Sequence, residues 1–182
     1  MIDILSCIKP ISEQEFKNLV NIRLNNIFEG LEKYNNSTLL SSINKDFLIK
    51  EKSFISFMEK SFDINKEKNK DKPLIIDFYL KDLDYESFNR LSELLDEEDK
   101  YILNNIKNNI NLNTNYFIIE DKRLVPFFVK LSTRELFFIT FYFTQLPITI
   151  WGNYELKFPT FYIEDEVFQK YKLLAEDNKL IL

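Results

Sequence analysis

The side chains with the most distinctive chemistry in this chain are carboxylates gathered between positions 82 and 99. This stretch holds eight acidic residues and a single basic one, Arg90. The acids are Asp82, Asp84, Glu86, Glu93, Asp96, Glu97, Glu98 and Asp99. A surface of one charge attracts a partner of the opposite charge and raises its association rate. The sequence therefore predicts an acidic docking surface for a basic partner, with these eight acids as candidate partner-binding residues.

Two other interpretations of this acidic segment stay open. Acids near the start of a helix stabilise it through the helix dipole, so the segment could be a solvated helix face without a partner. It could also hold a hard cation, but such a site alternates oxygen ligands around a glycine, and the segment has no glycine. We therefore expect no metal site here.

A second pattern of charged residues involves Asp77, Glu120 and Lys122. An Asp on one strand with Glu-x-Lys on the next is the skeleton of a metal-dependent nuclease site. Here Glu120 and Lys122 follow the end of a predicted strand at 116–119, where a charged turn is the simpler explanation. A carboxylate-dependent, metal-requiring nuclease is therefore an alternative hypothesis.

Aromatic residues around a predicted turn form a third candidate. Gly152-Asn153 is a typical turn pair, and Trp151 and Tyr154 flank it. Trp and Tyr are enriched among the residues that contribute most to protein interfaces. We therefore add Trp151 and Tyr154 to the candidate partner-binding residues.

Rare or missing residue types exclude several kinds of chemistry. The chain has no histidine, which removes histidine general bases, Ser-His-Asp triads and histidine-ligated metals. Its single cysteine, Cys7, lies in an apolar run, which favours a buried thiol and a reducing compartment. Two glycines leave no glycine-rich phosphate-binding loop. We therefore expect neither an enzyme nor a cofactor.

The overall composition is typical of a soluble folded protein. The chain has 182 residues, of which 45% are hydrophobic and 29% are charged. Its net charge of -5 argues against direct binding to nucleic acid or to an anionic membrane. The longest apolar stretch, 136–150, is too short to cross a bilayer as a helix, and the N-terminus lacks a basic signal-peptide region. We expect a cytoplasmic protein, and leave its oligomeric state open.

The helices that must position these residues follow from the spacing of apolar side chains. Ser12 and Glu15 form a capping-box pattern, and apolar residues at three- and four-residue steps predict a helix at about 13–34. Further helices are predicted at about 51–61, 84–95, 97–109 and 165–176. The polar, charged run at about 64–72 predicts an exposed loop.

Strands are predicted mainly in the second half of the chain. The run 74–80 is apolar on both faces, which favours a central strand covered by helices. Alternation over 135–144 gives one apolar face, formed by Phe137, Ile139, Phe141 and Phe143, that should pack on helices. Other strands are predicted at 116–119, 125–131, 147–151 and 156–163. This order predicts one α+β domain over 1–182, with N-terminal helices and a C-terminal helix packed on a largely antiparallel sheet.

In size, acidity and lack of catalytic residues, the whole chain resembles the immunity proteins of bacterial toxin systems. These small intracellular proteins each bind and block one cognate toxin domain. The resemblance assigns no site residues, but it implies a protein that neutralises a basic toxin domain, often a nuclease, by covering its active or substrate-binding surface. The alternatives are the carboxylate-dependent enzyme described above and an adaptor.

Overall fold

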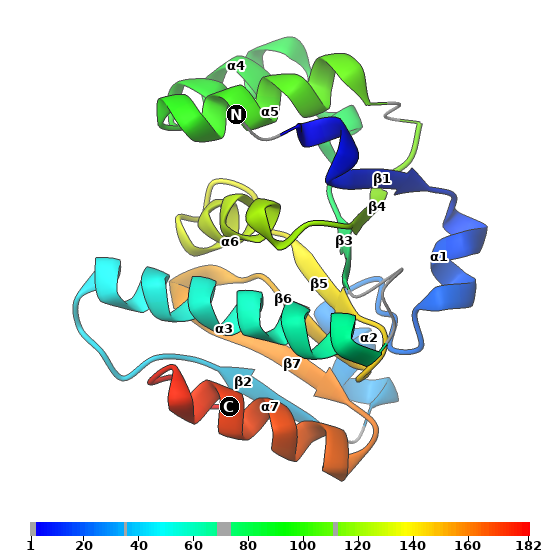
Figure 1. Ribbon diagram of the computed structural model, residues 1–182, viewed down its shortest axis with the longest axis vertical. Coiled ribbons are helices and arrows are strands. Elements are labelled where there is room, and N and C mark those ends of the chain that lie inside the picture. Colours follow the sequence, from blue (N-terminus) through cyan, green and yellow to red (C-terminus); the bar gives the residue numbers. More distant parts are fainter. Residues whose placement is uncertain (1–2, 35, 69–73, 111–112) are drawn as a thin grey trace.

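The computed structural model describes residues 3–34, 36–68, 74–110 and 113–182 (Figure 1). Within these ranges the chain forms seven α-helices and one seven-stranded sheet whose neighbouring strands are all antiparallel. The strand order is β1-β4-β3-β5-β6-β7-β2. The predicted α+β class, with helices packed on an antiparallel sheet and a C-terminal helix, is confirmed. None of the described helices is both long enough and apolar enough to cross a membrane.

The described residues form the following helices and strands, in the order of the chain. The helices are α1 (Glu13–Leu19), α2 (Ile27–Lys33), α3 (Phe47–Lys68), α4 (Tyr85–Glu93), α5 (Glu97–Asn109), α6 (Val125–Thr133) and α7 (Asp165–Asp177). The strands are β1 (Ile8–Ile11), β2 (Ser37–Leu40), β3 (Leu74–Asp77), β4 (Tyr116–Ile119), β5 (Thr140–Phe143), β6 (Ile148–Trp151) and β7 (Phe158–Tyr162). Short 3-10 helices are η1 (Ile4–Ser6), η2 (Leu80–Asp82), η3 (Lys122–Leu124) and η4 (Tyr154–Leu156).

The larger core lies between one face of the sheet and helices α3, α6 and α7 (Figure 1). Ile139, Phe141 and Phe143 point into this core and are at most 3% exposed. The predicted helix-facing stripe is therefore confirmed for these three residues, although Phe137 is only half-buried and β5 does not begin until Thr140. The α4–α5 pair packs near η1 and β1, at one end of the sheet.

The opposite face of the sheet is covered by α1, α2 and the segment that joins them. Phe16 and Val20 pack with Ile75 and Tyr142, and further along the sheet the α1–α2 connection packs on Phe161. Strand β3 is third in the sheet and is buried on both faces, as its apolar sequence predicted.

The single helix predicted at 13–34 is wrong between α1 and α2. The backbone becomes extended at Val20, and α2 begins only after Asn26, whose side chain accepts a hydrogen bond from the Glu29 amide. The intervening segment lays Ile22 and Leu24 on the sheet, and the Thr149 hydroxyl donates to the Ile22 carbonyl at 2.7 Å. The free energy gained by burying these apolar side chains offsets the loss of helical hydrogen bonds in this segment.

The exposed loop predicted at 64–72 is wrong for residues 64–68, because α3 continues to Lys68. Asn65 is fully buried there. Its side-chain oxygen accepts hydrogen bonds from the Gln145 and Leu146 amides, and its amide donates to the Tyr171 hydroxyl at 2.7 Å. These bonds fix the end of α3 against the β5–β6 turn. Residues 69–72 of the predicted loop lie outside the described residues.

The strand predicted at 125–131 is also wrong, since this run forms helix α6. Pro126 lies in the first turn, where its missing N–H costs no hydrogen bond. The run is apolar on almost every side, so its periodicity could not distinguish a buried helix from a strand. Strands β1 and β2, at the two edges of the sheet, were not predicted from the sequence.

Candidate functional site

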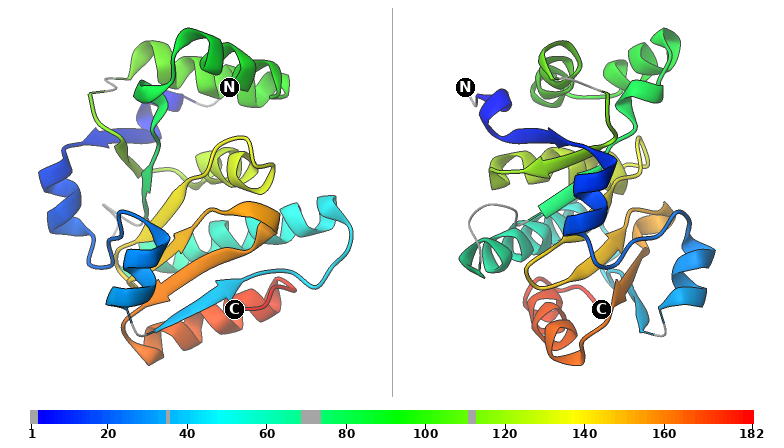
Figure 2. Two further views of the ribbon diagram at one scale, coloured as in Figure 1. Left: turned by 180° about the vertical axis from the view of Figure 1, so that it is seen from behind. Right: turned by 90° about the vertical axis from the view of Figure 1, so that its right-hand side faces the viewer.

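Two aspartates of the acidic segment begin its helices. Asp84 accepts a hydrogen bond from the Ser87 amide at 2.8 Å, and Asp96 accepts one from the Asp99 amide at 2.9 Å. Each bond satisfies an amide that the helix leaves free, and these backbone hydrogen bonds lower the pKa of both carboxyl groups. Helices α4 and α5 then lie side by side at one end of the molecule (Figures 1 and 2).

Asp99 departs from the predicted docking surface, because its side chain is buried and only 1% exposed. The Lys130 ammonium on α6 lies 2.5 Å from Asp99 Oδ1. Burial raises the pKa of the Asp99 carboxyl, and Lys130 opposes this rise. The pair therefore joins α5 to α6, and Asp99 is a structural residue that no partner can reach.

A second ion pair extends this connection to α3. Arg134 Nε and Nη2 donate to the two carboxylate oxygens of Glu51 at 2.8 and 3.0 Å, and Thr133 also donates to Glu51. Arg134 Nη1 lies 3.9 Å from Asp96, the N-cap of α5. The charged network thus fixes α5 relative to α3 and α6, which gives the acidic segment a rigid support.

All acids of the acidic segment except Asp99 are exposed, and those that do not cap a helix are Asp82, Glu86, Glu93, Glu97 and Glu98. Among the described residues, Glu86, Glu93 and Glu98 have no basic side chain within ion-pair distance. Glu97 pairs with Lys100 at 3.2 Å, and Asp82 accepts a hydrogen bond from Asn115. The exposed Tyr101 lies one turn beyond Glu97 and shares its face of α5. The exposed face of α4 and α5 therefore combines unpaired acids with apolar side chains.

A shallow apolar groove of about 180 Å³ borders α4. Its lining residues are Leu83, Ser87, Arg90, Leu91, Leu94, Leu136 and Phe137. Leu94 follows the unpaired Glu93 and is 60% exposed. Phe138, which follows the groove residue Phe137 in the sequence, packs edge-to-face on Tyr154, with ring centroids 4.6 Å apart. The segment joining α6 to β5 therefore lies between the acidic helices and the aromatic turn (Figures 1 and 2).

The two aromatic candidates of that turn have different surroundings. Tyr154 is 61% exposed and adjoins the groove side of the molecule through Phe138. Trp151 is half-buried and packs against the cluster around Phe161, on the second face of the sheet. Only Tyr154 is therefore placed to extend the surface formed by α4 and α5.

The three residues of the nuclease alternative are not brought together. In the β3–β4 register Asp77 faces Tyr116 while Leu74 faces Ile119, so Glu120 lies at the opposite end of the strand pair. Asp77 is buried, and Lys122 pairs with Asp63 at 2.7 Å. Within the described ranges, no group of three acidic or cysteine side chains could hold a metal ion.

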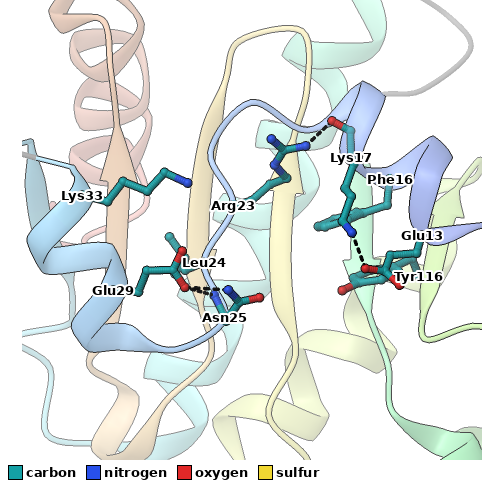
Figure 3. Close-up of a pocket in the computed structure, with 9 residues that line it drawn as sticks. All are labelled: Glu13, Phe16, Lys17, Arg23, Leu24, Asn25, Glu29, Lys33 and Tyr116. Atoms are coloured by element: carbon teal, nitrogen blue, oxygen red, sulfur yellow. Dashed lines mark hydrogen bonds and ion pairs between the residues drawn. The ribbon is translucent and has the colours of Figure 1, made fainter.

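A separate polar cavity of about 200 Å³ lies between α1 and α2 on the second face of the sheet (Figure 3). Phe16, Leu24 and Tyr116 line it together with charged side chains that include Lys17 and Arg23. The sequence did not predict this cavity, because it depends on the break in the helix predicted at 13–34. Asn25-Asn26, a pair that favours helix caps and turns, was the one signal for the break.

Comparisons with protein-family models, curated proteins and solved structures found no match to this chain. Its function is therefore inferred from the geometry and chemistry of its own surfaces.

Proposed function

We propose that this protein is a cytoplasmic binding protein that neutralises a basic protein partner, in the manner of an immunity protein that blocks a toxin domain. Its docking surface is the acidic face, defined as Glu86, Glu93, Leu94, Glu97, Glu98 and Tyr101 together with the bordering groove. The observation that carries the proposal is the exposure of three unpaired acids on α4 and α5, of which Glu86 and Glu93 lie on the helix that borders the groove.

Charge and apolar contact have separate roles in such an interface. The exposed acids steer a basic partner toward the acidic face and raise its association rate. Leu94, Tyr101 and the groove offer apolar area, whose removal from water slows dissociation. The ion pairs beneath α5 hold these groups in place before the partner arrives, which lowers the entropy cost of binding.

A nuclease toxin is the kind of partner that this surface fits best. An enzyme that binds nucleic acid must present a basic surface to the phosphate backbone. An acidic protein face competes for that surface, and covering it prevents substrate from binding. The general resemblance of the whole chain to immunity proteins favours neutralisation over the role of an adaptor.

The proposal is tested by capture of partners from the native host, followed by an inhibition assay. Wild-type protein is compared with the triple variant Glu93→Lys, Glu97→Lys, Glu98→Lys. A matched control, Glu32→Lys, Glu166→Lys, Glu176→Lys, changes the net charge equally at exposed acids on α2 and α7.

Wild type and control should capture the same basic protein and inhibit its activity, while the triple variant should lose both. Equal capture and inhibition by all three proteins would refute docking through the acidic face. A captured partner whose activity is unaffected would refute neutralisation and favour the adaptor.

A further inference from the structure

The cavity between α1 and α2 is lined by two cations, Arg23 and Lys33, that form no ion pair within the described part of the chain. Its charged lining consists of Glu13, Lys17, Arg23, Glu29 and Lys33. Both acids are already engaged. Glu13 lies 2.5 Å from the Lys17 ammonium, and Glu29 accepts hydrogen bonds from the Asn25 amide and side chain at 2.9 and 2.8 Å.

Arg23 and Lys33 can therefore still donate charge-assisted hydrogen bonds to a ligand, although the Lys33 ammonium also lies 5.4 Å from the centre of the Tyr34 ring. Arg23 donates one N–H to the Lys17 carbonyl, and within the described part of the chain neither cation has a carboxylate within ion-pair distance. In Figure 3 the Lys33 side chain points toward the segment of Arg23, and the Arg23 guanidinium points toward the Lys17 carbonyl; both side chains line the same cavity. Two positive charges on one cavity repel each other unless an anion lies between them.

The backbone around these cations is fixed by folding. The Arg23 amide donates to the Tyr34 hydroxyl at 3.0 Å, and the same hydroxyl donates to the Arg23 carbonyl at 3.1 Å. Gly30 packs so closely on Phe161 that a Cβ atom would come within 2.8 Å of the ring. This close approach holds α2, and with it Lys33, beside the segment that carries Arg23. The cavity is thus formed before any ligand binds.

We propose that this cavity binds a phosphate group, either as inorganic phosphate or on a compact phosphate monoester. A phosphate dianion matches the charge of Arg23 and Lys33. The planar guanidinium can donate two parallel hydrogen bonds to phosphate oxygens, and the ammonium adds a point charge. Phe16 and Tyr116, whose rings stack 3.8 Å apart, line one wall. This site lies on a different face from the acidic surface, so it can be tested without the protein partner.

The test is titration of the isotope-labelled protein with inorganic phosphate, at constant ionic strength maintained with sodium chloride and followed by two-dimensional NMR. Amide signals of Arg23, Asn25 and Lys33 should shift together and saturate. Arg23→Gln and Lys33→Gln should each weaken binding by about tenfold or more, since each removes a charge-assisted hydrogen bond. The exposed Lys170→Gln on α7 removes the same charge elsewhere and should bind like wild type.

Further measurements separate the possible outcomes. Acetate should bind more weakly than phosphate, and equal binding would overturn the phosphate assignment in favour of a carboxylate. Arg23→Lys keeps the charge but loses the planar fork, so it should bind more weakly than wild type. Thermal unfolding without phosphate identifies any variant that fails to fold. The proposal is overturned if the pocket signals do not shift, or if Lys33→Gln folds and binds phosphate as wild type does.

Discussion

Replacing the buried Asp77 by asparagine should change the free energy of unfolding in a pH-dependent way: relative to wild type, the variant should be more stable at neutral pH than in acid. Asp77 is 5% exposed. Burial raises the pKa of its carboxyl to about 6, even though the Thr140 amide and the Tyr142 hydroxyl donate to it at 2.7 and 3.2 Å. The pKa of an aspartate in an unfolded chain is about 3.9. The folded protein therefore binds this proton more tightly than the unfolded chain does.

The sign and size of the effect follow from this difference. The contribution of Asp77 to stability is greatest below about pH 4, falls as the pH rises to about 6, and is constant above that. A difference of about two pH units corresponds to about 3 kcal/mol, at 1.36 kcal/mol for each unit. Asparagine does not titrate and keeps an oxygen that can accept from the Thr140 amide. The free energy of unfolding of Asp77→Asn minus that of wild type should therefore rise by about 2 kcal/mol between pH 4 and pH 7, since part of the change occurs below pH 4.

Urea denaturation of both proteins at a series of pH values measures this difference. Subtracting the wild-type value at each pH removes the contribution of the titratable groups that the two proteins share. Tyr142→Phe provides a second check. It removes a hydrogen bond to the ionised carboxylate, so the midpoint of the fall in stability should move to higher pH. A difference between Asp77→Asn and wild type that does not change with pH, or that falls as the pH rises, would refute the burial of an ionisable group at this position.

Three further predictions concern the core, the charged network and metal ions. Phe141→Ala should lower the free energy of unfolding by about 3–5 kcal/mol because it leaves a cavity in the larger core, and a loss below about 1 kcal/mol in urea denaturation would contradict this. Lys130→Met should lower the free energy of unfolding by about 3 kcal/mol because it leaves the buried Asp99 carboxylate with only Arg134, 4.0 Å away, as a counterion, and adding Asp99→Leu should restore most of the loss. Calorimetric titration with magnesium, manganese and calcium should detect no tight site, and a stoichiometric micromolar site would revive the metal-dependent alternative.

The sequence predicted best where an apolar period was long or a capping residue was clear. Helices α4 and α5 were predicted close to their observed bounds, because their apolar side chains recur at three- and four-residue steps. The apolar run that forms α6 was assigned to a strand, since a helix buried on nearly all sides lacks a polar face. The break at Val20 depends on burial of Ile22 against a strand more than a hundred residues later, which local spacing does not show.

In the acidic segment, too, local features could be predicted from the sequence, whereas contacts between distant residues could not. The sequence gives eight acids but does not reveal that Asp99 faces Lys130, because that contact joins residues 31 positions apart. The capping roles of Asp84 and Asp96 could have been recognised from their places before the helices. The cavity between α1 and α2 could not be recognised from the sequence, since Arg23 and Lys33 line one cavity only after the chain turns between α1 and α2.

The most direct test of the central claim is the rate at which the isolated basic partner associates with the acidic face. Stopped-flow association is measured for three proteins at low and at physiological salt. They are the wild type, the triple variant Glu93→Lys, Glu97→Lys, Glu98→Lys, and the control Glu32→Lys, Glu166→Lys, Glu176→Lys. The triple variant should associate about tenfold or more slowly than wild type at low salt. This difference should shrink as the screening length falls to about 8 Å at physiological salt, and the control should stay close to wild type. Equal association rates for the triple variant and wild type at low salt would contradict the acidic face as the docking surface.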